Sequence, residues 1–573
     1  MSIQNNFPTI KPTLLLDFAN TRSLDPRITF ARASTATFYD DKTTAVAEQN
    51  LLLQSQTFGT TWITANGTLT TGILDPISGT TATTLTATSA NATVYETVTL
   101  LALPYTISFY VQRVTGTGTV NLTLDGTNFT AITVTGSWVR YSATVTPTAG
   151  SKTVGIQLVT SGDAVNIWGA QLEQRSTVSS YTPTTTQTIT NYIPVLQTAA
   201  SGVARFDCNP VTRESLGLLI EESRTNLFTY SDDFSNAAWA KTNSTITANT
   251  IVSPDGTLDA DKLVETATTN LHYISQTPTT GTSDTFTLTC YAKAAERRIV
   301  ELRIGDVGYS SGSRVYATFD LSTGTVGTIG SVTATNTSQS IASVGNGFYR
   351  ISVTATLSVT STTTLAFVSL RTSTSALSAG ESYTGDGYSG IYIWGAQLEA
   401  GAFPTSYIPT VASQVTRAID SANMTGTNFS SWYNQSQGTL YAEAALIGAT
   451  LDAVIASANS NSTANDIRLR ALSTNSALAF RVFANGVLEA SGTKNNAFTV
   501  GQSFKLAGFY QVNNFGFTSG GTTPVVDTLG VLGVETQLQL GAVGGTAAFN
   551  GTIKRFAYYP VAISSTELQG LTS

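Results

Sequence analysis

Polar and apolar residues alternate through most of this chain, and this alternation constrains the fold more than any other feature. In residues 105–112 the apolar positions are Ile107, Phe109 and Val111. In residues 286–293 they are Phe286, Leu288, Cys290 and Ala292. A period of two, interrupted by Gly, Asn and Asp, is typical of short antiparallel strands that bury one face. The sequence therefore predicts an all-β protein built from sandwiches.

One helix is expected near the end of the chain. Ser564 and Glu567 have the spacing of a capping box, in which each side chain satisfies a backbone N–H of the other residue. Leu568 follows as the first apolar residue of the expected helix.

The composition excludes several classes of protein. Charged residues are 11% of the 573 residues, against about 25% in an ordinary soluble domain, which argues against coiled coils. A net charge of −7 argues against a nucleic-acid-binding groove. No apolar run approaches the length of a membrane helix, and the start lacks the pattern of a secretory signal. We expect no nucleic-acid partner, no membrane insertion and no signal peptide.

Two long repeats organise the middle of the chain. The segment Ile167–Glu173 (IWGAQLE) recurs unchanged at Ile393–Glu399, and Asn50-Leu51 recurs as Asn226-Leu227. Each repeat is far larger than the 20–50 residues of a solenoid unit, which argues against a parallel β-helix. We predict one jelly-roll sandwich over residues 50–184 and a second over residues 226–411.

The remaining residues fall into three parts. Residues 1–49 precede the first repeat, residues 185–225 connect the two repeats, and residues 412–573 form a unit with different strand spacing.

Residues 13–20 (TLLLDFAN) and 24–37 (LDPRITFARASTAT) resemble a module widespread in bacteriophage tail-fibre and virion structural proteins. The usual continuation of that module resembles residues 204–207 (ARFD) and 216–222 (LGLLIEE). About 150 residues intervene, so we infer that the first sandwich is inserted within this module, with 185–225 completing it. The resemblance implies an adaptor that docks to other virion proteins through residues 1–49.

The repeats resemble phage-borne jelly-roll domains of the carbohydrate-binding-module type. The likeness lies in the Asn-Leu start, in residues 254–257 (PDGT) and in the WGAQLE ending. Residues 550–559 (NGTIKRFAYY) resemble a laminin-G or concanavalin-A-like lectin domain. These likenesses imply antiparallel sandwiches, two jelly rolls and a C-terminal lectin-like one, presented on trimeric fibres.

Candidate sugar-binding residues lie on the polar faces of the expected strands. Sugars stack their C–H faces on aromatic rings, while amides and charged groups hold the hydroxyls. In the second repeat the candidates are Tyr291, Lys293, Glu301 and Arg303. In the first they are Tyr110, Gln112 and Asn121. The alternative is that each tyrosine only shields its sheet. Trp239 is a further candidate, with core packing as its alternative, and alternation places Trp168 and Trp394 in the core.

Metal binding and catalysis have weaker signals. Asp255 and Asp386 are candidates for a structural calcium site, and both also fit ordinary Asp-Gly turns. No cofactor is required by any motif. His272 is the only histidine, and no nucleophile motif accompanies it. A glycosidase would need two carboxylates about 5–9.5 Å apart, a spacing that the sequence does not reveal.

These resemblances imply a non-catalytic virion fibre or spike, made in the host cytoplasm and located on the phage surface, that attaches to host surface glycans as a homotrimer. A purely structural head or tail decoration protein is the first alternative. A polysaccharide depolymerase is the second.

Overall fold

The computed structural model describes residues 10–179, 181–281, 283–307, 311–358, 363–375, 377–448, 453–543, 546–547 and 549–573. The pairings between its named strands are antiparallel, and its helices are short, so the expected all-β class is confirmed. Residues 44–193 form one compact unit, and residues 1–43 with 194–573 form another. None of the described helices is long and apolar enough to cross a membrane.

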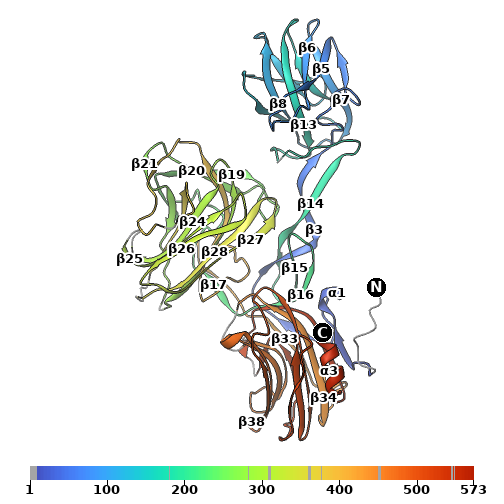
Figure 1. Cartoon of the computed structure of the whole chain (residues 1–573), viewed down its shortest axis with the longest axis vertical. Coiled ribbons are helices and arrows are strands. Elements are labelled where there is room, and N and C mark those ends of the chain that lie inside the picture. Colours follow the sequence, from blue (N-terminus) through green and yellow to red (C-terminus); the bar gives the residue numbers. More distant parts are fainter. Residues whose placement is uncertain are drawn as a thin grey trace. The chain divides into compact units, whose positions relative to one another are not determined.

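The first unit contains a sandwich of two five-stranded sheets (Figure 1). One sheet has the order β10 (Phe129–Ile132), β9 (Val120–Thr123), β12 (Gly150–Leu158), β7 (Ala92–Leu100) and β4 (Ile63–Ala65). The other, here called the β8 sheet, has the order β11 (Val139–Val145), β8 (Tyr105–Thr115), β13 (Ala164–Glu173), β6 (Ala82–Ala87) and β5 (Gly67–Ile73). The predicted apolar set Ile107, Phe109 and Val111 is fully buried between them.

The second sandwich repeats this plan with six strands in each sheet. The β23 sheet has the order β19 (Ser244–Ile251), β20 (Ala260–Glu265), β31 (Gly390–Ala400), β23 (Thr285–Ala294), β28 (Phe348–Thr356) and β27 (Thr335–Gly345). The β24 sheet has the order β18 (Ala240–Thr242), β22 (Tyr273–Gln276), β29 (Leu365–Arg371), β24 (Ile299–Val307), β25 (Ser311–Asp320) and β26 (Thr325–Val332). Strand β23 thus corresponds to β8, and β31 to β13.

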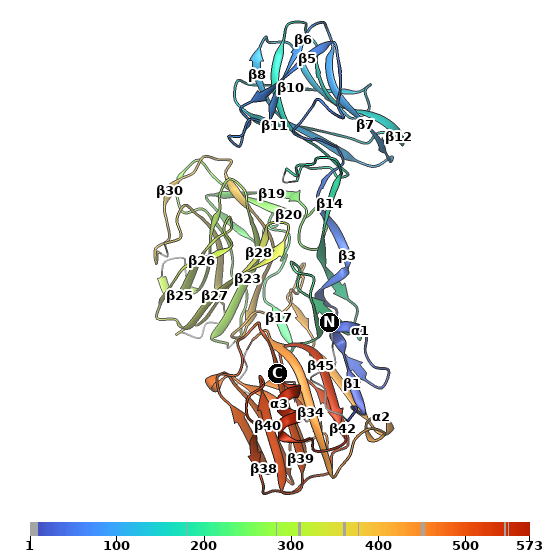
Figure 2. The ribbon, with the colours of Figure 1, turned by 45° about the vertical axis from the view of Figure 1, so that its right-hand side comes forward.

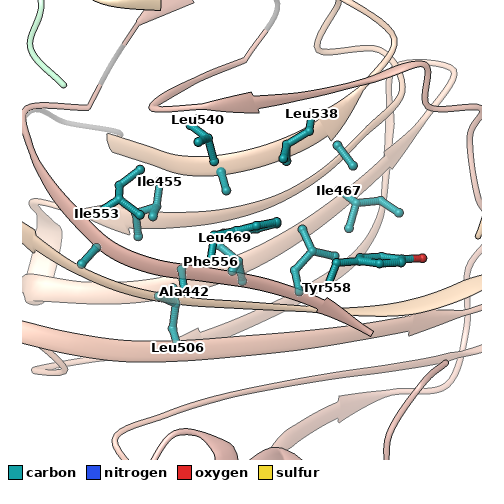
Figure 3. Packing of buried hydrophobic residues seen from close by; sticks show 14 of the residues in the cluster. Ala442, Ile455, Ile467, Leu469, Leu506, Leu538, Leu540, Ile553, Phe556 and Tyr558 are labelled. Atoms are coloured by element: carbon teal, nitrogen blue, oxygen red, sulfur yellow. The ribbon is translucent and has the colours of Figure 1, made fainter. Parts of the chain in front are cut away.

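The third sandwich holds the largest apolar core, and Figure 3 shows part of it. Its first sheet comprises β15 (Arg205–Cys208), β16 (Ser215–Ile220), β45 (Gly551–Tyr559), β34 (Gln437–Leu446), β39 (Ser503–Gln511), β40 (Asn514–Ser519) and β41 (Val525–Asp527), with β1 (Leu14–Leu16) beside β45. Its second sheet comprises β2 (Thr29–Ala31), β33 (Ser421–Thr425), β42 (Gln537–Leu540), β35 (Ala453–Asn459), β36 (Asp466–Leu472), β37 (Ala477–Ala484) and β38 (Val487–Lys494).

The expected separate N-terminal module is wrong, because its strands complete the third sandwich. Leu14 pairs with Tyr558 and Leu16 with Phe556, while Phe30 pairs with Ala422. Strands β1 and β45 can be followed in Figure 2. From the segment 185–225, Leu218 pairs with Ile553. The boundaries 1–49, 185–225 and 412–573 therefore cut through one sandwich. Both repeat sandwiches are insertions into it, whereas we expected only the first to be inserted.

Each insertion is flanked by two strands that are hydrogen-bonded to each other. Strands β3 (Ala36–Asn50) and β14 (Ile189–Ala199) flank the first sandwich in the sequence. Strands β17 (Arg224–Asn226) and β32 (Val415–Arg417) flank the second.

A buried ionic network joins the strands of the larger unit where the second insertion leaves the third sandwich. Arg205 donates to Glu221 at 2.7 Å and to Asp420 at 2.5 Å. Arg32 contacts Asp420 at 3.1 Å, and Arg417 contacts Glu221 at 3.0 Å. Burial alone would raise the pKa of Glu221, but the charges of Arg417 and Arg205 lower it to about 2.

The expected terminal helix is confirmed as α3 (Ser565–Leu571), with both bonds of the Ser564–Glu567 capping box present. The remaining described elements are short. They are α1 (Phe18–Thr21), α2 (Thr427–Ser430), the 3-10 turn η1 (Thr474–Ser476), β21 (Thr269–Asn270), β30 (Tyr383–Thr384), β43 (Ala542–Val543) and β44 (Thr546–Ala547).

Candidate functional site

The outer face of the β8 sheet, here called the β8 face, carries two parallel rows of side chains. The aromatic row consists of Arg140, Tyr110 and Trp168, which are register partners on β11, β8 and β13. The Tyr110 ring lies 5.3 Å from the Trp168 ring, and the Arg140 guanidinium lies 5.6 Å from the Tyr110 ring. Tyr110 remains partly exposed, whereas Trp168 is 2% exposed.

A bulge in β13 turns Trp168 to this face. Gly169 has a φ of +62°, and the pairing with β8 shifts between Trp168 and Gln171. A residue other than glycine rarely adopts this backbone conformation. The bulge reverses the alternation, so Ala170 faces the core while Trp168 does not. The prediction that Trp168 and Trp394 are core residues is confirmed, since each is 2% exposed. The equivalent bulge in β31 nevertheless places Trp394 in a separate buried cluster with Tyr291 and Tyr407 rather than in the main inter-sheet cluster.

The polar row lies next to the aromatic row. Gln112, Asn166, Thr84 and Thr70 are successive register partners on β8, β13, β6 and β5. Thr84 donates to Asn166 at 2.6 Å, Asn166 donates to Gln112 at 3.0 Å, and Gln112 donates to the carbonyl of Gly136 at 2.9 Å.

Trp138 extends the polar row at its β11 end. It directly precedes Val139, the first residue of β11, which pairs with Val111. It also lies two residues after Gly136, whose carbonyl accepts from Gln112. Its side chain is partly exposed. Its equivalent in the second sandwich is Phe348, the register partner of Lys293. Alternation in the sequence does not mark Trp138 as a site residue.

In the second sandwich the corresponding aromatic row is sealed. Tyr291 is 1% exposed, with Trp394 at 5.3 Å and the Arg350 guanidinium at 5.6 Å from its ring. Leu196 and Tyr39, from the strands that flank the first insertion, pack in the same apolar cluster. The expectation that Tyr291 is an exposed platform is wrong, because a segment distant in sequence covers it.

Lys293 lies on the same sheet and stays partly exposed. It is the register partner of Tyr392, which pairs in turn with Lys262. Lys262 contacts Glu296 at 2.7 Å. This row therefore occupies the position of the polar row but has a different chemistry.

Glu301 and Arg303 lie on β24, in the opposite sheet, so the structure does not bring them together with Tyr291 and Lys293. Their side chains are buried and contact each other at 3.0 Å. Arg303 also donates to the carbonyls of Leu377 and Ser378 at 2.9 and 2.8 Å. The expected open polar face is wrong here, because the 377–378 loop covers it.

Asn121 and Trp239 are also buried rather than presented to solvent. Asn121 lies on β9, outside the β8 sheet, and donates to Gln157 at 3.0 Å. Trp239 is 1% exposed, packs between Phe228 and Phe234, and donates to the carbonyl of Tyr230 at 2.9 Å. Trp239 is therefore a core residue, as the alternative interpretation predicts.

The asparagine that begins each repeat joins the start of its sandwich to strands near the end of the repeat. Asn50 donates to the carbonyls of Ala170 and Thr182, each at 2.9 Å. Asn226 donates in the same way to Ala396 at 3.2 Å and Ile408 at 2.9 Å. The repeated Asn-Leu start signals this role, which we did not infer from the sequence.

Asp255 and Asp386 both stabilise their own turns. Asp255 accepts from Ser253 and Thr257, and Asp386 accepts from Tyr388 and Ser389. Among the residues that the structure describes, no group of three or more His, Cys, Asp or Glu side chains could hold a metal ion. Structural calcium stays a prediction. His272 is buried, with its ring nitrogens 2.6 and 3.2 Å from the carbonyls of Asn243 and Tyr383.

An open hollow of about 590 Å³ lies beside β17 and β32. Arg224, Thr225, Thr279, Gln414 and Thr416 line it with their neighbours, and none of its lining residues is aromatic. It therefore lacks the ring on which a sugar would stack. The β8 face is the candidate that combines partly exposed rings with amides.

No family model matches the chain, and none of the curated proteins matches it. Among solved structures, the chain is similar to the CBM40 of Ruminococcus gnavus IT-sialidase bound to alpha2,3 sialyllactose, at 15% identity and a TM-score of 0.22, over 24% of this chain and 84% of that one. It is similar to domains LG4-5 of the mouse laminin alpha1 chain, at 9% identity and a TM-score of 0.17, over 50% and 85%. It is also similar to Trypanosoma rangeli sialidase in complex with sialic acid, at 9% identity and a TM-score of 0.20, over 90% and 84%. TM-scores of this size fall short of a shared fold, so the assignment of three sandwiches rests on the strand pairings given above.

Proposed function

We propose that this chain is a non-catalytic adhesion protein that binds glycans with the β8 face. The observation that carries the proposal is the difference between two equivalent faces. In the second sandwich the aromatic row lies under Tyr39 and Leu196, whereas in the first sandwich Tyr110 and Trp138 stay partly exposed beside amide side chains. A partly exposed ring can stack against the C–H face of a sugar, and a neighbouring amide can hydrogen-bond to its hydroxyl groups.

The setting that we propose is the surface of a phage particle, where the chain would form a fibre or spike that attaches to host surface glycans. This part rests on the resemblance of residues 13–37 and 204–222 to phage virion modules. A single sugar site of this kind binds weakly, so three copies on one fibre would raise the effective concentration of sites. Docking to other virion proteins is proposed for the N-terminal region, where Leu15 is 49% exposed on β1.

The test is glycan-array binding by the full chain and by two variants. Trp138→Ala and Gln112→Ala should each weaken binding about tenfold or more, which corresponds to about 1.4 kcal/mol. Tyr388→Ala, which removes a tyrosine that is 63% exposed on the second sandwich, is the matched control and should bind normally. Normal binding by both site variants would place the glycan elsewhere on the chain.

A structural spacer is the second candidate function. The observation that favours it is that the most similar residues of the two repeats make internal contacts. Asn50 and Asn226 bond to backbone carbonyls of their own sandwiches, and the tryptophans of the WGAQLE segments are buried. Failure of the full chain to bind any glycan or any host cell would favour this role. Incubation with host capsule should leave the polysaccharide at its full length; shortened chains would favour the depolymerase alternative.

A further inference from the structure

We infer that the ligand of the β8 face is an extended neutral polysaccharide that lies across the strands along the polar row. This inference rests on the proposed function and adds the class and direction of the ligand. Three features of the β8 face support it, namely the spacing of the row, its lack of available charge, and the contrast with the second sandwich.

The polar row has a regular spacing that a linear polymer can match. Trp138, Gln112, Asn166, Thr84 and Thr70 stand on five adjacent strands, one residue on each strand or directly before it. Neighbouring strands lie about 4.8 Å apart, an advance close to that of one sugar unit in an extended β-linked chain. Successive sugars can therefore meet the partly exposed or exposed side chains of Trp138, Gln112, Thr84 and Thr70. Asn166 is 9% exposed and holds Gln112 and Thr84 in place from between them.

The two rows offer no cation to an acidic sugar. Arg140 is the one charged residue among them, and its guanidinium is already engaged. It donates to Ser179 at 2.7 Å, to Ser108 at 3.0 and 3.2 Å, and to Gln171 at 3.2 Å. A carboxylate bound here would lose its hydration without gaining a counter-charge. Amides and hydroxyls both donate and accept, as the hydroxyls of a neutral sugar do.

The fold does not require a neutral row at this place. In the second sandwich the same register positions hold Lys293, Tyr392 and Lys262. The amides and threonines of the first sandwich are therefore a property of this face rather than a consequence of the shared architecture.

The experiment uses the full chain and two matched series of probes. The neutral series is β-1,4-linked glucose oligomers from dimer to hexamer, and the acidic series is oligogalacturonates of the same lengths. We expect affinity for the neutral series to rise with length up to about the number of strands crossed. We also expect it to change less than twofold when ionic strength rises from about 0.05 to about 0.5 M.

Two variants test the position and the direction of the ligand. Gln112→Lys, which installs the residue of the second sandwich, should weaken neutral binding at least tenfold. Thr70→Ala should leave the shortest oligomers unaffected and remove the gain in affinity of the longest ones, because Thr70 lies exposed at the far end of the row. Thermal melting checks that both variants remain folded, and Tyr388→Ala again serves as the control.

The outcomes separate this inference from the proposed function. Tighter, salt-sensitive binding of the acidic series would overturn the inference and leave glycan adhesion intact. Neutral binding that does not depend on length, or that neither variant alters, would also overturn it. An absence of binding to these probes and to a broad glycan array would overturn the proposed function itself.

Discussion

Glu535 is a single carboxyl whose burial makes the stability of the third sandwich depend on pH. It is 1% exposed, and it accepts a hydrogen bond from Tyr433 at 3.2 Å, with the carboxylate of Asp466 nearby. Burial raises the pKa of Glu535 to about 7. Because the folded chain holds this proton more tightly than the unfolded chain, the free energy of unfolding falls as pH rises from about 4.5 to about 7.

Glu535→Gln should remove the contribution of Glu535 to this dependence. The difference in unfolding free energy between the variant and the parent should shift by roughly 2–3 kcal/mol in favour of the variant between pH 5 and pH 8. Thermal melts across that range measure it. Glu214→Gln, at a carboxylate that is 60% exposed, should follow the parent at every pH. Parallel curves for Glu535→Gln and the parent would contradict the argument.

At the scale of the residue, alternation predicts which way a side chain points but not what covers it. Ile107 and Phe286 are buried as expected, and so is Cys290. Tyr110 and Tyr291 share a position in the repeat, yet only Tyr291 is sealed, because Tyr39 and Leu196 come from strands far away in the sequence. No local pattern contains that information, so the predicted platform was wrong in the second repeat and remains a candidate in the first.

At the scale of the element, the WGAQLE segment shows how one glycine changes a strand. The strand itself is predictable from alternation and from its exact repetition. The bulge is not predictable from a period of two. Gly169 adopts a positive φ, and the side chains after it therefore point to the opposite face from the one that strict alternation predicts. The same reversal occurs at Gly395, with a φ of +57°.

Gly169→Ala should therefore destabilise the first sandwich by about 1–3 kcal/mol, since the new methyl group would lie 3.1 Å from the Tyr110 ring in an unfavourable backbone conformation. Calorimetry of the full chain should show one transition moving to a lower temperature. Gly59→Ala is the matched control in the same sandwich, because no atom lies within 4 Å of the added methyl group. Equal melting of the two variants would argue that the bulge is not needed.

At the scale of the whole molecule, two sandwiches are inserted into a third. The repeats and their boundaries are readable in the sequence because whole motifs recur. The pairing of Leu14 with Tyr558 is not readable, because register between distant strands leaves no local signal. The buried arginine network escaped prediction for the same reason, since its members are scattered between Arg32 and Asp420.

Arg205→Met should cost about 3–5 kcal/mol, because it leaves the buried carboxylates of Glu221 and Asp420 short of a counter-charge. Chemical denaturation of the full chain measures this loss. Lys554→Met removes a surface ion pair with Glu214 and should change the midpoint very little. A small effect of Arg205→Met would mean that the remaining arginines hold the network together.

The distance along the chain between β1 and its partner strand determines the order of assembly. Asp17 and Arg555, which contact each other at 3.1 Å beside this pairing, are 538 residues apart. A nascent polypeptide must emerge from the ribosome through β45 before that sheet can close, and both inserted sandwiches can finish folding first. A translation product that stops short of Gly551 would therefore carry two finished sandwiches on an open sheet edge, which makes it prone to aggregation and to degradation.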